Sequence, residues 1–80
     1  MLISKFSNPK SSIYYLSAQI LKELKNNNPN ANVVDLFIHL KNNINPLFTY
    51  ANYILALDWL FLLGVIRLNN EKVILCISNN

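Results

Sequence analysis

Apolar residues recur at helical spacing in the first half of the chain. They fall every three or four positions, as one buried stripe on a helix requires. They are Ile13, Leu16, Ile20, Leu21 and Leu24. Ser11 or Ser12 is placed to cap the first turn, because a serine hydroxyl accepts a hydrogen bond from an otherwise unpaired amide. Since Pro29 cannot continue a helix, we expect this one to end near Asn27 or Asn28.

A second, shorter helix is expected after Asn32. Asp35 would lie in its first turn, where a negative charge meets the positive end of the helix dipole. Its apolar positions have the spacing of one helix face. They are Val33, Leu36, Phe37 and Leu40. The pattern therefore predicts two amphipathic helices separated by a short break at Pro29.

The third helix is bounded by two backbone signals. Asn45 followed by Pro46 is typical of a cap and a first helical turn, so the helix begins there, or at Thr49 if the first turn is irregular. Gly64 can adopt the left-handed conformation that ends helices. The positions expected to face the core are Tyr53, Ala56, Leu57 and Leu60.

After Gly64 the pattern becomes extended. Residues 65–68 and 72–77 are rich in β-forming side chains, and Asn69-Asn70 between them predicts a tight hairpin turn. Residues 2–6 are expected to add a third short strand. The order strand, three helices, two strands is typical of a small winged helix-turn-helix domain. We therefore predict an α+β fold in a single domain covering residues 1–80.

The composition is unusually apolar for so short a chain. Of the 80 residues, 52% are hydrophobic and 14% are charged, against about 25% charged in an ordinary domain. A chain of this size buries only roughly 60% of the surface that its unfolded form exposes. Large exposed apolar patches usually mark interaction sites, so the composition predicts a protein partner.

Apolar residues surround the third helix on all sides. Leu55, Trp59, Phe61 and Leu62 occupy the circumference outside the core stripe, where a surface helix carries polar residues. Asp58 lies among them and either faces water or pairs with a cation on a partner, because a buried lone carboxylate is costly. We predict that these five residues bind a partner. Alternatively, Trp59 and Leu62 pack under the N-terminal strand or the hairpin and bind nothing.

The second hairpin strand is predicted to be apolar on both faces. At the edge of a sheet its backbone can accept a strand from another protein, and we expect Ile74 and Cys76 to extend the partner-binding surface. The alternative is that the N-terminal strand pairs with it. Cys76 is the single cysteine, which excludes a disulfide framework within the chain. With no secretory signal pattern at the N-terminus, we expect a cytoplasmic protein.

The apolar third helix does not fit a membrane span or a typical DNA-reading helix. Residues 54–66 contain Asp58 and are shorter than the stretch of about 20 residues that a membrane span needs. No Lys or Arg lies between Pro46 and Gly64 to neutralise phosphates. Lys41, Arg67 and Lys72 allow a weak contact with DNA from outside this helix. A small winged-helix transcriptional regulator is therefore the alternative function, and a self-associating structural protein is a third.

The pattern gives no basis for catalysis. His39 is the single histidine and is expected to be a partly exposed helix residue, whereas metal sites and triads need several convergent groups. Of the acids, Glu23 is expected as a surface charge and Glu71 beside the hairpin turn. The single glycine excludes a glycine-rich phosphate loop within this chain. We expect neither enzymatic activity nor a cofactor or metal.

Residues 53–72, YILALDWLFLLGVIRLNNEK, carry a family resemblance. The aromatic and aliphatic pattern around Ala56-Leu57-Asp58 and Leu63-Gly64 resembles the small middle component of bacterial ABC-three component systems. The opening MLISKF and the helix segment ILKELK are also similar to that family. The resemblance implies a hetero-oligomer with an SMC-like ABC ATPase and an effector, often a nuclease, in systems that include Lamassu-type defence against phages and plasmids. It implies no catalytic residues, and contact with nucleic acid mainly through the complex.

Overall fold

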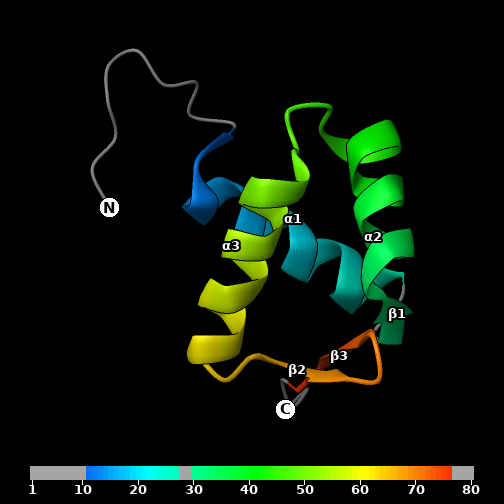
Figure 1. Cartoon of the computed structure of the whole chain (residues 1–80), viewed down its shortest axis with the longest axis vertical. Helices are drawn as coiled ribbons and strands as arrows, with labels where there is room; N and C mark the ends of the chain where they lie inside the picture. The colour runs from blue at the N-terminus through cyan, green and yellow to red at the C-terminus, as the bar shows by residue number, and fades with distance from the viewer. Residues whose placement is uncertain (1–10, 28–29, 77–80) are drawn as a thin grey trace.

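The computed structural model describes residues 11–27 and 30–76. Their elements, in chain order, are α1 (Ile13–Asn26), β1 (Asn30–Asn32), α2 (Val33–His39), η2 (Leu40–Ile44), α3 (Tyr50–Leu62), β2 (Ile66–Asn69) and β3 (Lys72–Leu75). The π-helical η2 continues α2. In Figure 1, α1 crosses behind the upright α3, α2 stands to the right, and the strands lie below. These residues form a small α+β domain of three helices and a three-stranded antiparallel sheet.

Polar caps define where the first two helices begin. The Ser12 hydroxyl accepts a hydrogen bond from the Tyr15 amide at 3.1 Å, so Ser12 is the cap of α1. The Asn32 side chain accepts from the amides of Val34 and Asp35, at 2.9 and 3.2 Å. Asp35 lies in the first turn of α2, as predicted. Both helix starts follow from side chains that satisfy orphan backbone amides.

The third helix begins at the later of its two predicted positions. Thr49 caps α3 by accepting from the Asn52 amide at 3.2 Å, and the Asn52 side chain accepts from the Thr49 amide at 2.8 Å. Asn45 and Pro46 open a turn instead of a helix. The Asn45 side-chain oxygen Oδ1 accepts from the Leu47 amide at 3.0 Å, and the side-chain amide of the same residue donates to Gln19 on α1 at 2.9 Å. These bonds hold the segment outside the helical conformation.

A Schellman motif ends α3. The Gly64 amide donates to the Phe61 carbonyl at 3.0 Å, and the Val65 amide donates to the Leu60 carbonyl at 3.1 Å. Gly64 has φ of 80°, the left-handed conformation predicted for it. The chain thus leaves α3 towards β2 with the carbonyls of Leu60 and Phe61 bonded.

The sheet corrects two predictions made from the sequence. Its order is β1-β3-β2, so β3 is the central strand and not an edge available to a partner strand. The missed strand, β1, has only three residues, Asn-Ala-Asn, which is too short to show a period of two. The turn residues are Asn70 and Glu71, with φ of 50° and 67°, one position later than predicted. The strand predicted for residues 2–6 and the end of the one predicted for 72–77 lie outside the described residues.

The core lies where the three helices meet the sheet. The four α3 residues predicted to face it are at most 2% exposed, which confirms the predicted buried stripe. They are Tyr53, Ala56, Leu57 and Leu60. Helix α1 packs against α3, and Phe37 of α2 contacts the rings of Tyr50 and Tyr53. The core therefore covers one side of α3, whereas the opposite side is exposed in the described part of the chain.

Candidate functional site

The outer face of α3 carries four of the exposed large apolar residues of the described chain. We define it as Leu55, Asp58, Trp59, Phe61 and Leu62, all of which are exposed. Leu55, Asp58 and Leu62 follow one another at spacings of three and four residues, directly opposite the buried stripe. The Leu62 side chain is 79% exposed, more than any other large apolar side chain among the described residues.

A shallow hollow continues this face towards α1. It has a volume of about 210 Å³ and mostly apolar lining residues. They are Tyr14, Ser17, Ala18, Leu21, Trp59, Leu60 and Leu63. Trp59 borders the hollow and is 45% exposed, so much of this residue remains open to solvent. The face and the hollow together offer a ridge with a depression beside it, the shape that accepts an apolar side chain of a partner.

Asp58 is the single charged residue of α3. Its side chain is exposed, and it forms no hydrogen bond or ion pair with any other residue of the described chain. The helix contains no Lys or Arg. A protein that covered the neighbouring leucines would also remove water from this carboxylate.

The other two predicted partner-binding residues lie in or after the central strand. Ile74 is half-buried, and the strand register places it between Arg67 of β2 and Asn30 of β1. The surface around Ile74 is therefore mixed, in contrast to the apolar surface predicted for this strand. Cys76 is exposed just after β3, and its amide donates to the Val65 carbonyl at 2.9 Å.

The three cations proposed for DNA contact differ in whether their side chains are bonded to other residues of the described chain. The Lys41 ammonium donates to the backbone carbonyls of Phe48, at 3.1 Å, and Pro46, at 3.4 Å. Arg67 and Lys72 are exposed on the hairpin. Lys41 thus stabilises the loop before α3, and the two hairpin cations are the ones that remain directed to solvent.

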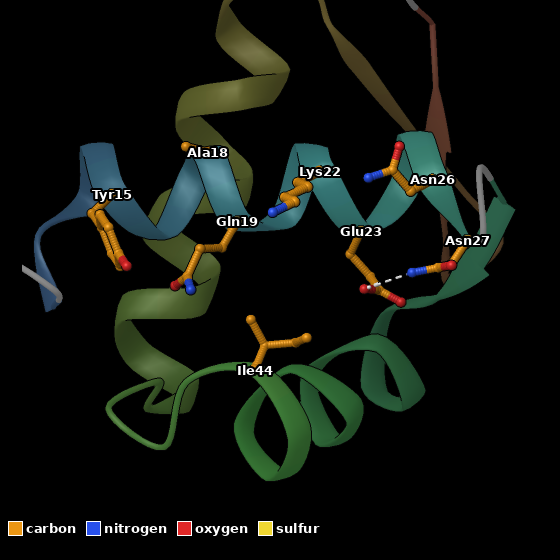
Figure 2. A pocket seen from close by; sticks show the side chains of 8 residues that line it. All are labelled: Tyr15, Ala18, Gln19, Lys22, Glu23, Asn26, Asn27 and Ile44. Atoms are coloured by element: carbon orange, nitrogen blue, oxygen red, sulfur yellow. Dashed lines mark hydrogen bonds between the residues drawn. The ribbon is translucent and has the colours of Figure 1, made fainter.

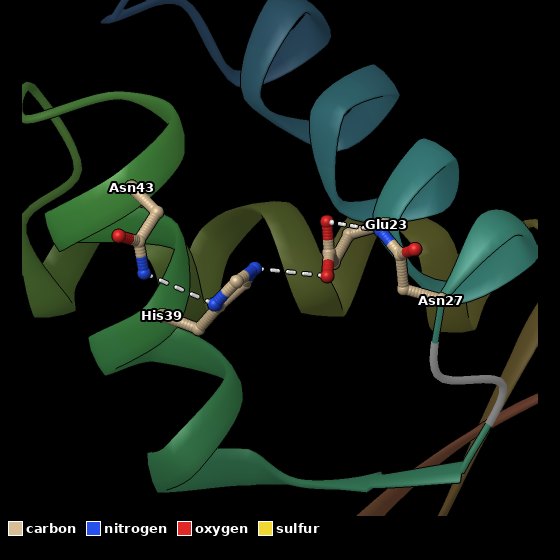
Figure 3. Close-up of polar contacts among 4 residues, drawn as sticks. All are labelled: Glu23, Asn27, His39 and Asn43. Atoms are coloured by element: carbon tan, nitrogen blue, oxygen red, sulfur yellow. Dashed lines mark hydrogen bonds and ion pairs between the residues drawn. The ribbon is translucent and has the colours of Figure 1, made fainter.

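Glu23 corrects another sequence prediction. It is 8% exposed, not a surface charge, and its carboxylate lies 2.9 Å from Nε2 of His39 on α2. In Figure 3 the Asn27 side chain lies against Glu23, and Asn43 lies beside His39. The Asn27 side-chain amide donates to the other carboxylate oxygen, and Nδ2 of Asn43 lies 3.1 Å from Nδ1 of His39. A neutral imidazole with its proton on Nε2 satisfies both contacts, because Nδ1 then accepts from Asn43. The cluster joins α1 to α2.

A second hollow lies between α1 and the segment after α2. It has a volume of about 410 Å³ and is more polar than the one beside Trp59. In Figure 2, Gln19, Lys22 and Glu23 project from α1, and Ile44 projects towards them from η2. Nothing in the sequence pattern indicated this hollow, since it depends on how α1 and η2 pack.

The remaining features limit the chemistry of the described residues. No three His, Cys, Asp or Glu side chains of residues 11–27 and 30–76 gather as a metal site would need. None of the helices in that part of the chain has both the length and the apolar character needed to cross a bilayer. The feature that stands out is the outer face of α3.

The family comparison agrees with the resemblance seen in the sequence. A family model described as ABC-three component (ABC-3C) system Middle Component 6 matches residues 3–76. The chain belongs to this family. No curated protein and no solved structure matches it. As a middle component it is an accessory component of an ABC-three component system, and a system of several components implies protein partners.

Because a middle component has protein partners, the exposed residues predicted to bind a partner can be compared with their positions in the structure. Five of the seven residues predicted to bind a partner lie together on the outer face of α3, whereas Ile74 and Cys76 lie in or just after β3. The sequence signal for the α3 face was the presence of apolar residues around the whole helix, with Asp58 as the single charge. No such signal existed for Tyr14, because it lies on α1 and reaches the same hollow only through packing.

Proposed function

We propose that this middle component is a non-enzymatic adaptor that joins an SMC-like ABC ATPase to a nuclease-type effector. The complex would act in the bacterial cytoplasm against phages or plasmids, as a Lamassu-type defence system. The family match supports the accessory role. The observation that carries the adaptor role is the apolar outer face of α3, which has no cover within the described chain.

An exposed apolar face favours partner binding, because leaving its side chains in water is unfavourable in free energy. Burying a Leu or Phe side chain stabilises a complex by about 1.5 to 3 kcal/mol relative to full exposure. Leu55, Phe61 and Leu62 are each more than half exposed, so a partner gains from covering all three. Trp59 lies beside them on the same face, and tryptophan is one of the residues enriched in binding hot spots.

The proposal includes a winged helix-turn-helix fold. Three helices followed by the β2–β3 hairpin, with β1 completing the sheet, support it. In that fold the third helix is the one that reads DNA in many regulators. Here it carries one carboxylate and no cation, so its outer face suits a protein better than a phosphate backbone.

A DNA-binding regulator is the second candidate function. Arg67 and Lys72 are exposed on the hairpin, which supports contact with a phosphate backbone. Binding of this kind would weaken steeply with added salt, because each neutralised phosphate releases counterions. A duplex-binding assay at two salt concentrations distinguishes it from the adaptor role.

The adaptor role is tested by mild affinity purification. The tagged protein is expressed with the genes that neighbour its own, and the bound proteins are identified by mass. Recovery of a large coiled-coil ATPase together with an effector is the expected result. Recovery of the protein alone, as a monomer, would contradict the proposal, and recovery as a homo-oligomer would favour a self-associating structural protein.

A further inference from the structure

We infer that the outer face of α3 receives an amphipathic helix of a partner subunit, and that this helix carries an Arg or Lys opposite Asp58. The inference rests on the proposed function and names the kind of partner segment that this surface fits. It follows from the position of one carboxylate in an apolar face, from the backbone of α3, and from the hollow beside Trp59.

Asp58 cannot be left out of the interface. It lies one turn from Leu55 and one turn from Leu62 on the same side of α3, so a segment that covers both leucines also covers the carboxylate. A carboxylate that loses water without gaining a cation or hydrogen-bond donors is strongly unfavourable. Since the described chain supplies no partner to Asp58, the covering segment must supply one.

A second copy of α3 does not meet this requirement. The helix has no Lys or Arg, and two-fold pairing of identical outer faces would bring two carboxylates into one interface without a cation on either helix. A phosphate backbone is excluded from this face for a similar reason, because it would meet negative charge and leucines. The charge of α3 therefore favours a basic segment of a different protein.

The backbone of α3 favours a helix as that segment. The face consists of side chains, and helical amides and carbonyls are bonded within their own helix. A strand or loop laid on it would bury backbone groups with nothing to bond to, whereas a helix satisfies its own. The hollow of about 210 Å³ between α1 and α3 then accepts one large apolar side chain beside Trp59.

The test uses the assembly recovered with its neighbouring gene products. A photo-reactive amino acid at position 62, in place of the exposed Leu62, is cross-linked, and the attached peptide is sequenced. We expect a peptide with apolar residues at helical spacing and a Lys or Arg among them. Asp58→Arg is expected to weaken the assembly at least about tenfold. Changing that partner cation to Asp in the same assembly should restore most of the loss.

Glu71→Arg is the matched control, because it reverses an exposed acid in the hairpin turn and should leave the affinity unchanged. Cross-linking to a second copy of this chain would overturn the inference, as would a peptide without a cation or failure of the charge exchange to restore binding. In each of these cases an intact assembly would keep the adaptor role. Absence of any assembly would overturn the proposed function itself.

Discussion

The hydroxyl of Tyr53 donates a hydrogen bond to the backbone carbonyl of Val33, with 2.6 Å between the two oxygens. The amide of the same Val33 donates to the carbonyl of Glu71 in the hairpin turn at 2.8 Å. The backbone of one residue at the start of α2 therefore bonds to both α3 and the sheet. These bonds fix α3 with its buried stripe inward and its outer face in solvent.

Replacing Tyr53 by Phe is expected to reduce stability by about 1 kcal/mol, because the Val33 carbonyl loses a buried donor. Burial raises the pKa of the Tyr53 phenol above its ordinary value, and the neighbouring Tyr50 adds to the rise. The folded protein then keeps a proton that the unfolded chain loses above pH ~10. Wild-type stability should fall as pH rises beyond that point.

The Tyr53→Phe variant should lack this part of the alkaline loss, since it has no phenol to titrate at that position. Chemical unfolding between pH 8 and pH 11 measures the effect. Tyr14→Phe serves as the control, because it makes the same change at a residue that is 74% exposed. Equal pH dependence in the wild type and Tyr53→Phe would contradict the role assigned to this phenol.

Ser17 of α1 and Ser12 at its N-cap should respond in opposite ways to replacement by alanine. The Ser17 hydroxyl is buried without a hydrogen-bond partner in the described structure, and the residue is 4% exposed. Ser17→Ala should raise the free energy of unfolding by about 1 kcal/mol, because it removes an unsatisfied polar group. Ser12→Ala should lower it by about 1 kcal/mol, because the cap of α1 is lost. A loss of stability in Ser17→Ala would show that its hydroxyl has a partner.

Two positions with positive φ should also respond in opposite ways. Gly64→Ala is expected to cost about 1 kcal/mol, because φ is 80° and a Cβ there would meet no atom within 4 Å, so the cost is backbone strain alone. Glu71→Gly should stabilise by up to about 1 kcal/mol, since Asn followed by Gly suits a turn in which both residues have positive φ. Thermal unfolding measures both, and a destabilised Glu71→Gly would contradict the assigned turn.

The helices could be predicted from the sequence because their signals are local. Ser12, Asn32 and Thr49 cap the residues that directly follow them, and Gly64 ends α3 through bonds to its own last turn. Strand β1 could not be found this way, because three residues carry no period and pair with β3 some forty positions later. Strand β1 forms because it pairs with β3, which is far away in the sequence.

The pairing of Glu23 with His39 could not be predicted from local sequence either. Its position did fit the buried stripe of α1, since it follows Leu16 by seven residues and Ile20 by three, and helical spacing alone could have placed it inside. The pairing with His39 depends on how α1 meets α2, which no spacing reveals. The exposed face of α3 was predictable because Asp58 is the single charged residue among the apolar residues of the helix. The hollow beside Trp59 was not predictable, because α1 supplies more than half of its lining residues.

The most direct test of the adaptor role compares Leu62→Asp with Leu62→Met in the assembly formed with the neighbouring gene products. Leu62 is largely exposed, so both variants should keep the fold, which circular dichroism of the isolated protein verifies. The size of the assembly is then measured by light scattering. The adaptor role through α3 predicts full assembly with Leu62→Met and loss of this protein from the assembly with Leu62→Asp. Full assembly with a folded Leu62→Asp variant would contradict it.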